Sequence, residues 1–190
     1  MSTFKETSMG AIFQNRAGQY GDRALVSFKN KDGVWEDLSW NQLNEKVKNT
    51  GYYLLSKGIK PGDKIALFSP NRYEWWVADL AILSVGAVNV PIYATNSPQE
   101  CRYIIENSDS VMCFTGTIEH TDKILAVKND LPNVREVIIF DEPGSINSNV
   151  TPLSTAMTEG SRYPDKDELN KRLASIDIDD VATIIYTSGT

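Results

Sequence analysis

From residue 60 onward, short apolar runs alternate with longer amphipathic stretches, and turn or capping residues separate them. Residues 64–69 are an apolar run that directly follows the turn signal Pro61-Gly62-Asp63, and Gly86 is placed to end the helical stretch after it. The same alternation continues to the end of the chain. It predicts strands over residues 64–69, 87–92, 110–115, 134–140 and 181–186, separated by helices that start near Asn71 and Ser97 and that cover about residues 117–130 and 165–175.

Two of these helices carry recognisable starting signals. Asn71 is a candidate helix cap with Glu74 three residues later, and Ser97 is followed by Pro98 and then by Glu100 in the same relative position. This arrangement is typical of a capping box, in which the cap side chain and the acidic side chain each accept a backbone N–H.

Before residue 60 the order of elements differs. The pattern predicts a helix over residues 9–20 and then two short strands over residues 24–28 and 34–38. A long amphipathic helix follows, and Ser39 with Gln42 is its predicted cap.

Strands that alternate with helices favour parallel pairing through right-handed crossovers. We therefore expect an α/β fold with a layered, mostly parallel sheet and flanking helices. Pro91 cannot donate a ladder hydrogen bond, so the strand over residues 87–92 should end there or lie at an edge of the sheet. Residues 141–161 are rich in Ser, Thr, Asn, Gly and Pro, and we expect them to be mostly loop. A chain of 190 residues fits one domain or one large subdomain.

Composition narrows the functional classes. Apolar residues make up 41% of the chain, which is enough to fill a core and argues against a disordered protein. The formal net charge of -6 argues against a nucleic-acid partner, because phosphate backbones are bound by clustered Lys and Arg. The most apolar stretch, residues 77–93, is interrupted by Asp79, Asn89 and Pro91, so we expect no transmembrane segment.

Three features bear on localisation and metals. The first ten residues have no apolar signal-peptide core. Cys101 and Cys113 have neither metal-ligand spacing nor a disulfide framework, and two lone thiols fit a reducing cytosol. His120, the only histidine, is expected to be a polar residue near a helix start. We therefore expect a cytoplasmic protein with no metal ligands in this chain, and contact with the inner face of the membrane stays open.

The candidate chemistry lies at residues 186–190, where a predicted buried strand runs into a loop of hydroxyls and glycine. Thr187, Ser188, Gly189 and Thr190 would expose hydroxyls and backbone N–H groups in one place, as phosphate oxygens require. Ser, Thr and Gly also dominate ordinary turns, and on these five residues alone a turn at a strand end is the better interpretation. No residue before Thr187 is assigned a catalytic role.

Two other features favour structural interpretations. The adjacent Trp75 and Trp76 cannot both face one side of a helix, so we expect one to pack inward and the other to face a groove or a neighbour. The acidic residues 177–180 are expected to form a solvated turn, because no second carboxylate cluster accompanies them.

Three segments, taken in order, resemble the adenylate-forming superfamily of acyl-CoA synthetases, luciferases and peptide-synthetase adenylation domains. Residues 38–43 (Leu-Ser-Trp-Asn-Gln-Leu) are similar to the first core motif, Leu-Thr-Tyr-x-Glu-Leu, with Trp and Gln as departures. Residues 82–93 resemble the Gly-Ala-x-x-Val-Pro segment, and residues 186–190 match the opening of the Thr-Ser-Gly-Thr phosphate loop. Residues 71–80 and 179–186 look most like the long-chain fatty acid ligases of this superfamily.

The resemblance implies a parent enzyme that activates a fatty carboxylate with ATP and Mg²⁺ and then transfers the acyl group to CoA. It implies that Thr187, Ser188, Gly189 and Thr190 hold the β- and γ-phosphates of ATP. Residues 1–190 would then be the N-terminal portion of an AMP-binding domain, ending inside the phosphate loop. On this interpretation we expect the chain alone to be inactive and to bind ATP, CoA and Mg²⁺ poorly.

Two other classes stay open. One is a stand-alone α/β nucleotide-binding module without ligase chemistry. The other is a non-catalytic interaction module, which could form a homodimer through an exposed apolar surface.

Overall fold

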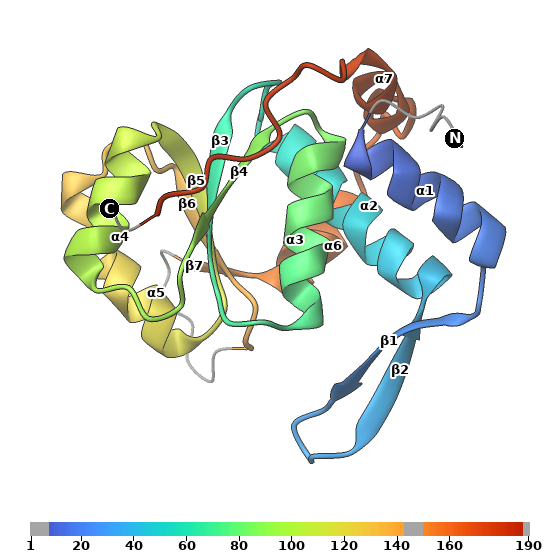
Figure 1. Cartoon of the computed structure of the whole chain (residues 1–190), viewed down its shortest axis with the longest axis horizontal. Helices are drawn as coiled ribbons and strands as arrows, with labels where there is room; N and C mark the ends of the chain where they lie inside the picture. The colour runs from blue at the N-terminus through green and yellow to red at the C-terminus, as the bar shows by residue number, and fades with distance from the viewer. Residues whose placement is uncertain (1–7, 143–149, 188–190) are drawn as a thin grey trace.

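The computed structural model describes residues 8–142 and 150–187. Within these residues five parallel strands form one sheet in the order β4-β3-β5-β6-β7 (Figure 1). The strands are β3 (Lys64–Phe68), β4 (Val88–Ile92), β5 (Ser110–Thr115), β6 (Glu136–Ile139) and β7 (Val150–Pro152). The predicted α/β fold is therefore confirmed, and β4, the strand that contains Pro91, lies at the end of this order.

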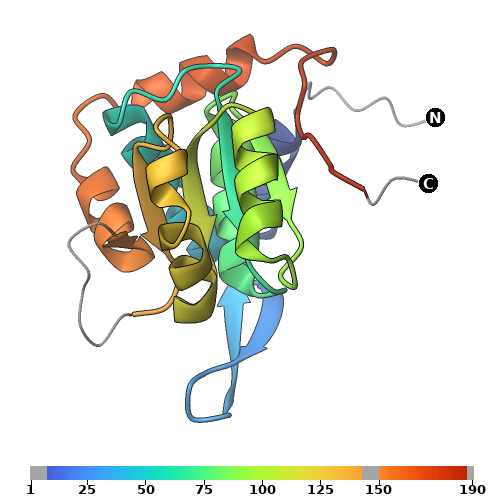
Figure 2. The same cartoon turned by 90° about the vertical axis from the view of Figure 1, so that its left-hand side faces the viewer.

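The two faces of the sheet enter two separate apolar clusters, because successive side chains of a strand point to opposite faces. Ile65 and Leu67 of β3 belong to one cluster, and Ala66 and Phe68 belong to the other. Helices cover both faces (Figures 1 and 2). The first cluster contains residues of α1 (Met9–Tyr20), α2 (Trp40–Ser56), α3 (Tyr73–Ser84), α6 (Leu153–Ser161) and α7 (Asp167–Ser175), and the second contains residues of α4 (Pro98–Asn107) and α5 (Ile118–Leu125).

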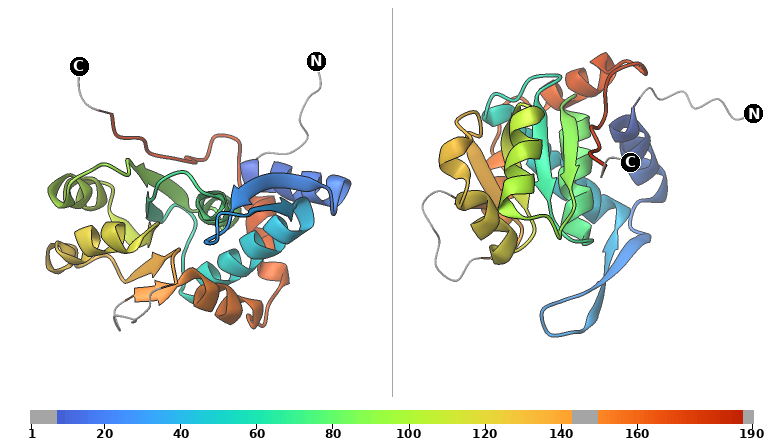
Figure 3. Two further views of the ribbon diagram at one scale, coloured as in Figure 1. Left: turned by 90° about the horizontal axis from the view of Figure 1, so that it is seen from below. Right: turned by 60° about the vertical axis from the view of Figure 1, so that its left-hand side comes forward.

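A separate two-stranded hairpin projects from the body of the molecule (Figures 2 and 3). It consists of β1 (Ala24–Lys29) and β2 (Trp35–Ser39), which pair antiparallel. Both strands were expected from the sequence.

The caps of α2 and α4 are as predicted. The Gln42 N–H donates to the Ser39 hydroxyl over 3.2 Å, and the Ser39 N–H donates to Gln42 Oε1 over 2.8 Å. Ser97 and Glu100 form the same reciprocal pair at the start of α4. Each box satisfies backbone donors that the first helical turn leaves without a partner.

The predicted capping box of α3 is wrong. The helix begins at Tyr73 and its cap residue is Arg72, which makes no side-chain cap. The Glu74 carboxylate instead accepts two hydrogen bonds from the Arg72 guanidinium, over 2.7 and 2.8 Å. A bidentate charged pair is stronger than a neutral amide cap, so Glu74 is engaged by Arg72 rather than by Asn71.

The prediction of mostly loop over residues 141–161 is also wrong, because β7 and α6 lie there; residues 143–149 fall outside the described part. Leu153, Ala156 and Gly160 form a buried stripe on α6. A Cβ added to Gly160 would lie 1.9 Å from the carbonyl oxygen of Asn49 in α2. The small residues therefore allow α6 to pack closely on α2, which the composition of the segment did not indicate.

The helix predicted over residues 117–130 is shorter than expected. The α-helix α5 ends at Leu125, and a 3₁₀ turn, η1 (Lys128–Asp130), follows. Leu131 has φ -118° and ψ 65°, outside the helical region. Pro132 disfavours helical geometry at the residue before it, so no helix can continue beyond this turn.

Candidate functional site

The prediction of a buried strand over residues 181–186 is wrong in part. The segment runs parallel to β4, but it meets the sheet in an isolated bridge between Asn89 and Thr183 (Figure 1). Val181 and Ile185 are 63% and 61% exposed. The segment that leads into the candidate phosphate loop is therefore an extended, exposed addition to the edge of the sheet.

The chemistry of β4 explains why this pairing is so short. Backbone groups of alternate residues in a strand point to opposite sides, so Ala87, Asn89 and Pro91 present theirs to the segment. The Asn89 N–H donates to Ala182 O over 3.0 Å, and Asn89 O accepts from the Ile184 N–H over 3.0 Å. The Ala87 N–H is already bonded to Ile82 O, and Pro91 has no N–H. Asn89 is therefore the one position of β4 with an N–H available to the segment.

A second attachment holds the end of the segment. The Tyr186 hydroxyl donates to Asn107 Oδ1 at the end of α4 over 2.7 Å, and its ring meets the Tyr103 ring edge-on at 6.3 Å between centroids. Burial raises the pKa of Tyr186, so the hydroxyl keeps its proton. Thr187 follows and is exposed. The predicted site residues Ser188, Gly189 and Thr190 lie outside the described residues.

The carboxyl ends of β3 and β5 form the point where strand order reverses, which is where open parallel sheets commonly bind ligands. Here the chain itself fills that position. A Cβ added to Gly116, just after β5, would lie 2.4 Å from Ser69 Oγ and 2.8 Å from Pro70 Cδ. The close approach of these two loops closes the crevice.

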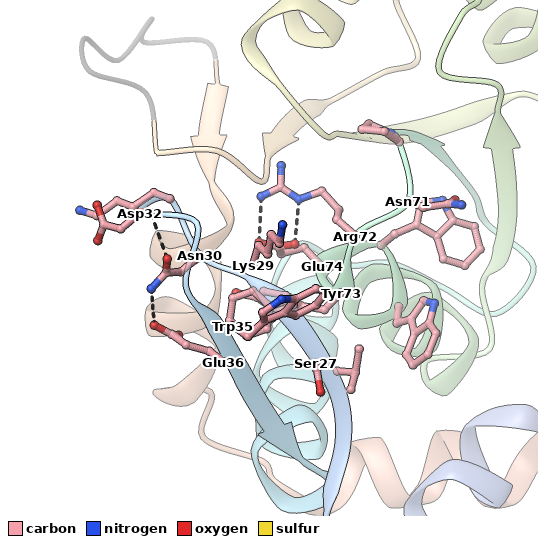
Figure 4. A pocket seen from close by; sticks show the side chains of 16 residues that line it. Ser27, Lys29, Asn30, Asp32, Trp35, Glu36, Asn71, Arg72, Tyr73 and Glu74 are labelled. Carbon is pink, nitrogen blue, oxygen red and sulfur yellow. Dashed lines mark hydrogen bonds and ion pairs between the residues drawn. The ribbon is translucent and has the colours of Figure 1, made fainter.

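Arg72 connects elements at the same edge of the sheet, and Figure 4 shows its pairing with Glu74. Besides Glu74, its guanidinium donates to Asp141 Oδ1 over 2.7 Å and to Gly116 O over 2.8 Å. Hydrogen bonding to Glu74 raises the pKa of Arg72. Because its donors are committed to Glu74 of α3 and to the loops after β5 and β6, we interpret Arg72 as a structural cation rather than a ligand-binding one.

A groove of about 1200 Å³ lies between the β1–β2 hairpin and the start of α3 (Figure 4). Its walls include the aromatic side chains Phe28, Trp35, Tyr73, Trp75 and Trp76. Trp75 packs against the core while Trp76 is 45% exposed, which confirms the expected division between the two tryptophans. Burial raises the pKa of Tyr73 to about 12, so this groove carries no phenolate at neutral pH.

His120 has the structural role expected of it. Its Nε2 lies 3.1 Å from Ala94 O and its Nδ1 lies 2.5 Å from the Thr117 hydroxyl oxygen. A carbonyl can only accept, so Nε2 carries the proton and Nδ1 accepts from Thr117. Burial lowers the pKa of His120, which favours this neutral form.

The thiols and carboxylates offer little chemistry. Cys101 and Cys113 are buried, and burial raises the pKa of Cys101 to about 12. Residues 177–180 form the expected exposed turn, in which the Asp180 N–H donates to Asp177 O over 3.1 Å. In the part of the chain that the structure describes, no group of three or more His, Cys, Asp or Glu residues could hold a metal ion.

A family model described as AMP-binding enzyme matches residues 13–190. The chain belongs to this family. Among curated AMP-binding relatives, the long-chain-fatty-acid–CoA ligase FadD15 of Mycobacterium bovis is 37% identical over 161 residues, covering 84% of this chain and 26% of that protein. The long-chain-fatty-acid–CoA ligase ACSBG2 of Xenopus laevis is 28% identical over 180 residues, covering 94% of this chain and 24% of that protein. The chain thus spans about a quarter of the length of these relatives.

Several solved structures share the fold. The anthranilate CoA ligase AuaEII aligns with a TM-score of 0.79 at 15% identity, over 100% of this chain and 33% of that one. A Mycobacterium tuberculosis fatty acyl CoA synthetase aligns with a TM-score of 0.66 at 22% identity, over 96% and 33%. Within residues 8–142 and 150–187, no helix is both long and apolar enough to cross a membrane.

Proposed function

We propose that this chain is the N-terminal part of an AMP-forming ligase that joins a long-chain fatty acid to CoA at the expense of ATP. The observation that carries the proposal is the 37% identity to FadD15 across 84% of the chain, together with family membership over residues 13–190. The motifs at residues 38–43, 82–93 and 186–190 support it from the sequence.

The reaction has two displacements. A carboxylate oxygen of the fatty acid attacks the α-phosphorus of ATP, and the bond from that phosphorus to the bridging oxygen breaks, releasing pyrophosphate. The thiolate of CoA then attacks the acyl carbon of the acyl-adenylate, and AMP leaves with the carboxylate oxygen. Mg²⁺ would neutralise part of the charge on the departing pyrophosphate.

In this proposal the chain's own contribution to the reaction is the start of the phosphate loop. Thr187, Ser188, Gly189 and Thr190 supply hydroxyl and backbone donors for the β- and γ-phosphates, which carry more charge as pyrophosphate leaves. The chemistry of this donor set fits phosphate oxygens. The attachments of Asn89 and Tyr186 support the proposal, since they hold the residues just before the loop against the sheet.

We infer that the 190-residue chain alone has no ligase activity. The curated relatives are about three to four times as long as this chain, and we assign no acyl, adenine or CoA site among the described residues before Thr187. Calorimetry should detect no micromolar binding of ATP to this chain, and micromolar affinity would refute the inference.

The test of the function is made on the full-length protein. Pyrophosphate release is measured with ATP, Mg²⁺, CoA and a panel of carboxylic acids from acetate to oleate. Release that depends on a long-chain acid supports the proposal, whereas release with another acid keeps the chemistry and changes the substrate class. No release with any acid from folded protein contradicts it.

A matched pair of variants tests the loop. Thr187→Val removes one hydroxyl from the proposed phosphate contacts, and hydrogen bonds to charged groups contribute about 1.5–3 kcal/mol, so kcat/KM for ATP should fall about 10- to 150-fold. Thr155→Val makes the same change at an exposed position of α6 and should leave kcat/KM unchanged.

One observation favours a second role in assembly. Ile178, Val181 and Ile185 are more than 60% exposed and lie on one short stretch of chain. An apolar surface of this kind favours association, either with the rest of the protein or with a second copy in a homodimer. Light scattering of the 190-residue chain over a range of concentrations distinguishes a dimer from a monomer.

A further inference from the structure

Asn89 is a polar residue in an apolar strand. It lies between Val88 and Val90 of β4 and is 2% exposed, although Asn is disfavoured in strands. Its Nδ2 donates to Asp79 Oδ1 of α3 over 2.7 Å. Its Oδ1 is buried and has no hydrogen-bond partner among the described residues. A buried acceptor without a partner is costly, so this oxygen needs a donor.

The residue opposite Asn89 can supply that donor. Asn89 and Thr183 are partners in a parallel bridge, so their side chains leave the sheet on the same face. The neighbouring Ile184 and Tyr186 pack on the other cluster, which agrees with this orientation. Facing side chains on adjacent strands begin about 5 Å apart at Cβ, so rotation of the Thr183 side chain can bring its hydroxyl to Asn89 Oδ1.

We propose that Asp79, Asn89 and Thr183 form a hydrogen-bonded chain that fixes the register of residues 181–186 on β4. Asp79 accepts from the Asn89 amide nitrogen, which forces the amide oxygen to be the free end. The Thr183 hydroxyl then donates to that oxygen. The role of residues 187–190 in binding phosphate, which this register would position, rests on the proposed function. These three are positioning residues and touch no substrate.

Register needs such a device because the backbone pairing is so limited. A slip of two residues would place Val181 or Ile185 opposite Asn89, and neither carries a donor. A slip of one residue would turn Ile184 and Tyr186 away from α4. Each residue of slip moves the following loop by about 3.3 Å, which is more than a hydrogen bond tolerates.

Asp79 is suited to act as the hydrogen-bond acceptor that orients the Asn89 side chain. Burial raises its pKa, and the hydrogen bond from Asn89 acts in the opposite direction. An ionised carboxylate at this position can only accept, so it orients the Asn89 amide with its oxygen free. Asp79→Leu removes the acceptor and should therefore release the Asn89 side chain.

Amide hydrogen exchange on the 190-residue chain tests the register directly. The readout is the exchange rate of the Ile184 N–H, which donates to Asn89 O. Thr183→Val keeps the β-branched shape and removes the hydroxyl, so exchange should rise about 3- to 10-fold. Thr183→Ser should restore most of the protection, and Thr155→Val should have no effect. Equal rates for Thr183→Val and wild type, or equal rates for Thr183→Val and Thr183→Ser, would overturn the proposal.

The same variants separate this inference from the function in the full-length protein. Thr183→Val should lower kcat/KM for ATP by about 3- to 10-fold, through a lower kcat and a higher KM for ATP, and should leave KM for the fatty acid unchanged. Thr183→Ser should restore kcat and KM for ATP. Unaltered constants in Thr183→Val would refute the positioning role. If wild-type protein releases no pyrophosphate, the proposed function fails, and the exchange result still decides whether the three residues set the register.

Discussion

Strand β4 has two neighbours, and the contrast between them shows what makes a strand in this molecule. On one side β3 pairs with it over five residues, from Lys64–Val88 to Phe68–Ile92. On the other side residues 181–186 meet it in a single bridge. Both neighbours are rich in apolar residues, and residues 181–186 hold more β-branched side chains than β3, so composition does not explain the difference.

The difference lies in what β4 offers to each side. Toward β3 its backbone presents the residues Val88, Val90 and Ile92, each of which has an N–H, and the Val88 N–H donates to Asp63 O just before β3 over 2.8 Å. Toward the segment it presents Asn89 and Pro91, and only Asn89 can donate. Helices also bury both faces of β3, while Val181 and Ile185 remain exposed. A strand therefore needs donors on the edge that it joins and cover on its faces. Among the described residues, β4 offers residues 181–186 one donor, and Val181 and Ile185 have no such cover.

The largest expected effect comes from truncating the same kind of side chain on the two neighbours. Leu67→Ala leaves a cavity in a fully buried site and should lower the free energy of unfolding by about 2–5 kcal/mol. Ile185→Ala should change it by less than about 0.5 kcal/mol, because the side chain is mostly exposed. Urea denaturation of the 190-residue chain measures both. Similar losses would mean that the segment is part of the core.

Next in size is a test of close packing in the body. Gly160→Ala forces a Cβ against the α2 backbone and should destabilise the chain by about 1–3 kcal/mol or more. Gly18→Ala is the control, since a Cβ there meets nothing within 4 Å and Ala is the better helix former. It should stabilise the chain by about 0.5–1 kcal/mol. Thermal and urea unfolding check both signs; a neutral Gly160→Ala would contradict the packing of α6 on α2.

A smaller effect should follow from giving β4 the donor that it lacks. Pro91→Val supplies an N–H on the outer side, where the next ladder bond to the segment would form, with a net value of about 0.5–1.5 kcal/mol. Exchange of the amides of residues 184–186 should slow. Pro98→Ala, which alters a proline at the start of α4 instead, is the control and should leave these amides unaffected. Unchanged exchange in Pro91→Val would show that the missing donor is not what limits pairing.

The smallest expected effect is a pH dependence in the body, beside the loop that follows β4. Burial lowers the folded-state pKa of His120 below its ordinary value of 6.5, so the unfolded chain takes up a proton first as pH falls. The stability that His120 contributes is complete above about pH 6.5 and is lost as pH falls below it. His120→Gln should flatten the dependence between pH 7.5 and 5.5 in urea denaturation. An unchanged slope would assign the dependence to other groups.

Local signals predicted much of this fold, and long-range contacts account for what they missed. The capping box at Ser97 depends on four consecutive residues, so the sequence is sufficient to predict it. Glu74 was expected to cap α3, but it pairs with Arg72. Arg72 also donates a hydrogen bond to Asp141, which lies 69 positions later in the sequence. The helix α6 was missed because Gly160 acts through contact with another helix, where composition indicates a loop. The local sequence of residues 181–186 did not predict their short pairing, because the pairing depends on Pro91 of a different strand.

The candidate site is less completely predicted than the fold. The sequence points to residues 187–190 through a resemblance, and of these the structure describes Thr187. Analysis of the sequence assigned no role to Asn89, although a polar residue inside the run Ala-Val-Asn-Val was an available signal. The meaning of that signal required the contact with Asp79 and the pairing with Thr183.

The most direct test of the central claim follows one oxygen atom through the reaction. The full-length protein is incubated with ATP, Mg²⁺, CoA and oleate labelled with ¹⁸O in both carboxylate oxygens, and the AMP is analysed by mass spectrometry. An acyl-adenylate route transfers one carboxylate oxygen to phosphorus, so the account predicts AMP that carries one ¹⁸O and forms in step with oleoyl-CoA. Unlabelled AMP, or ADP as the nucleotide product, would contradict it.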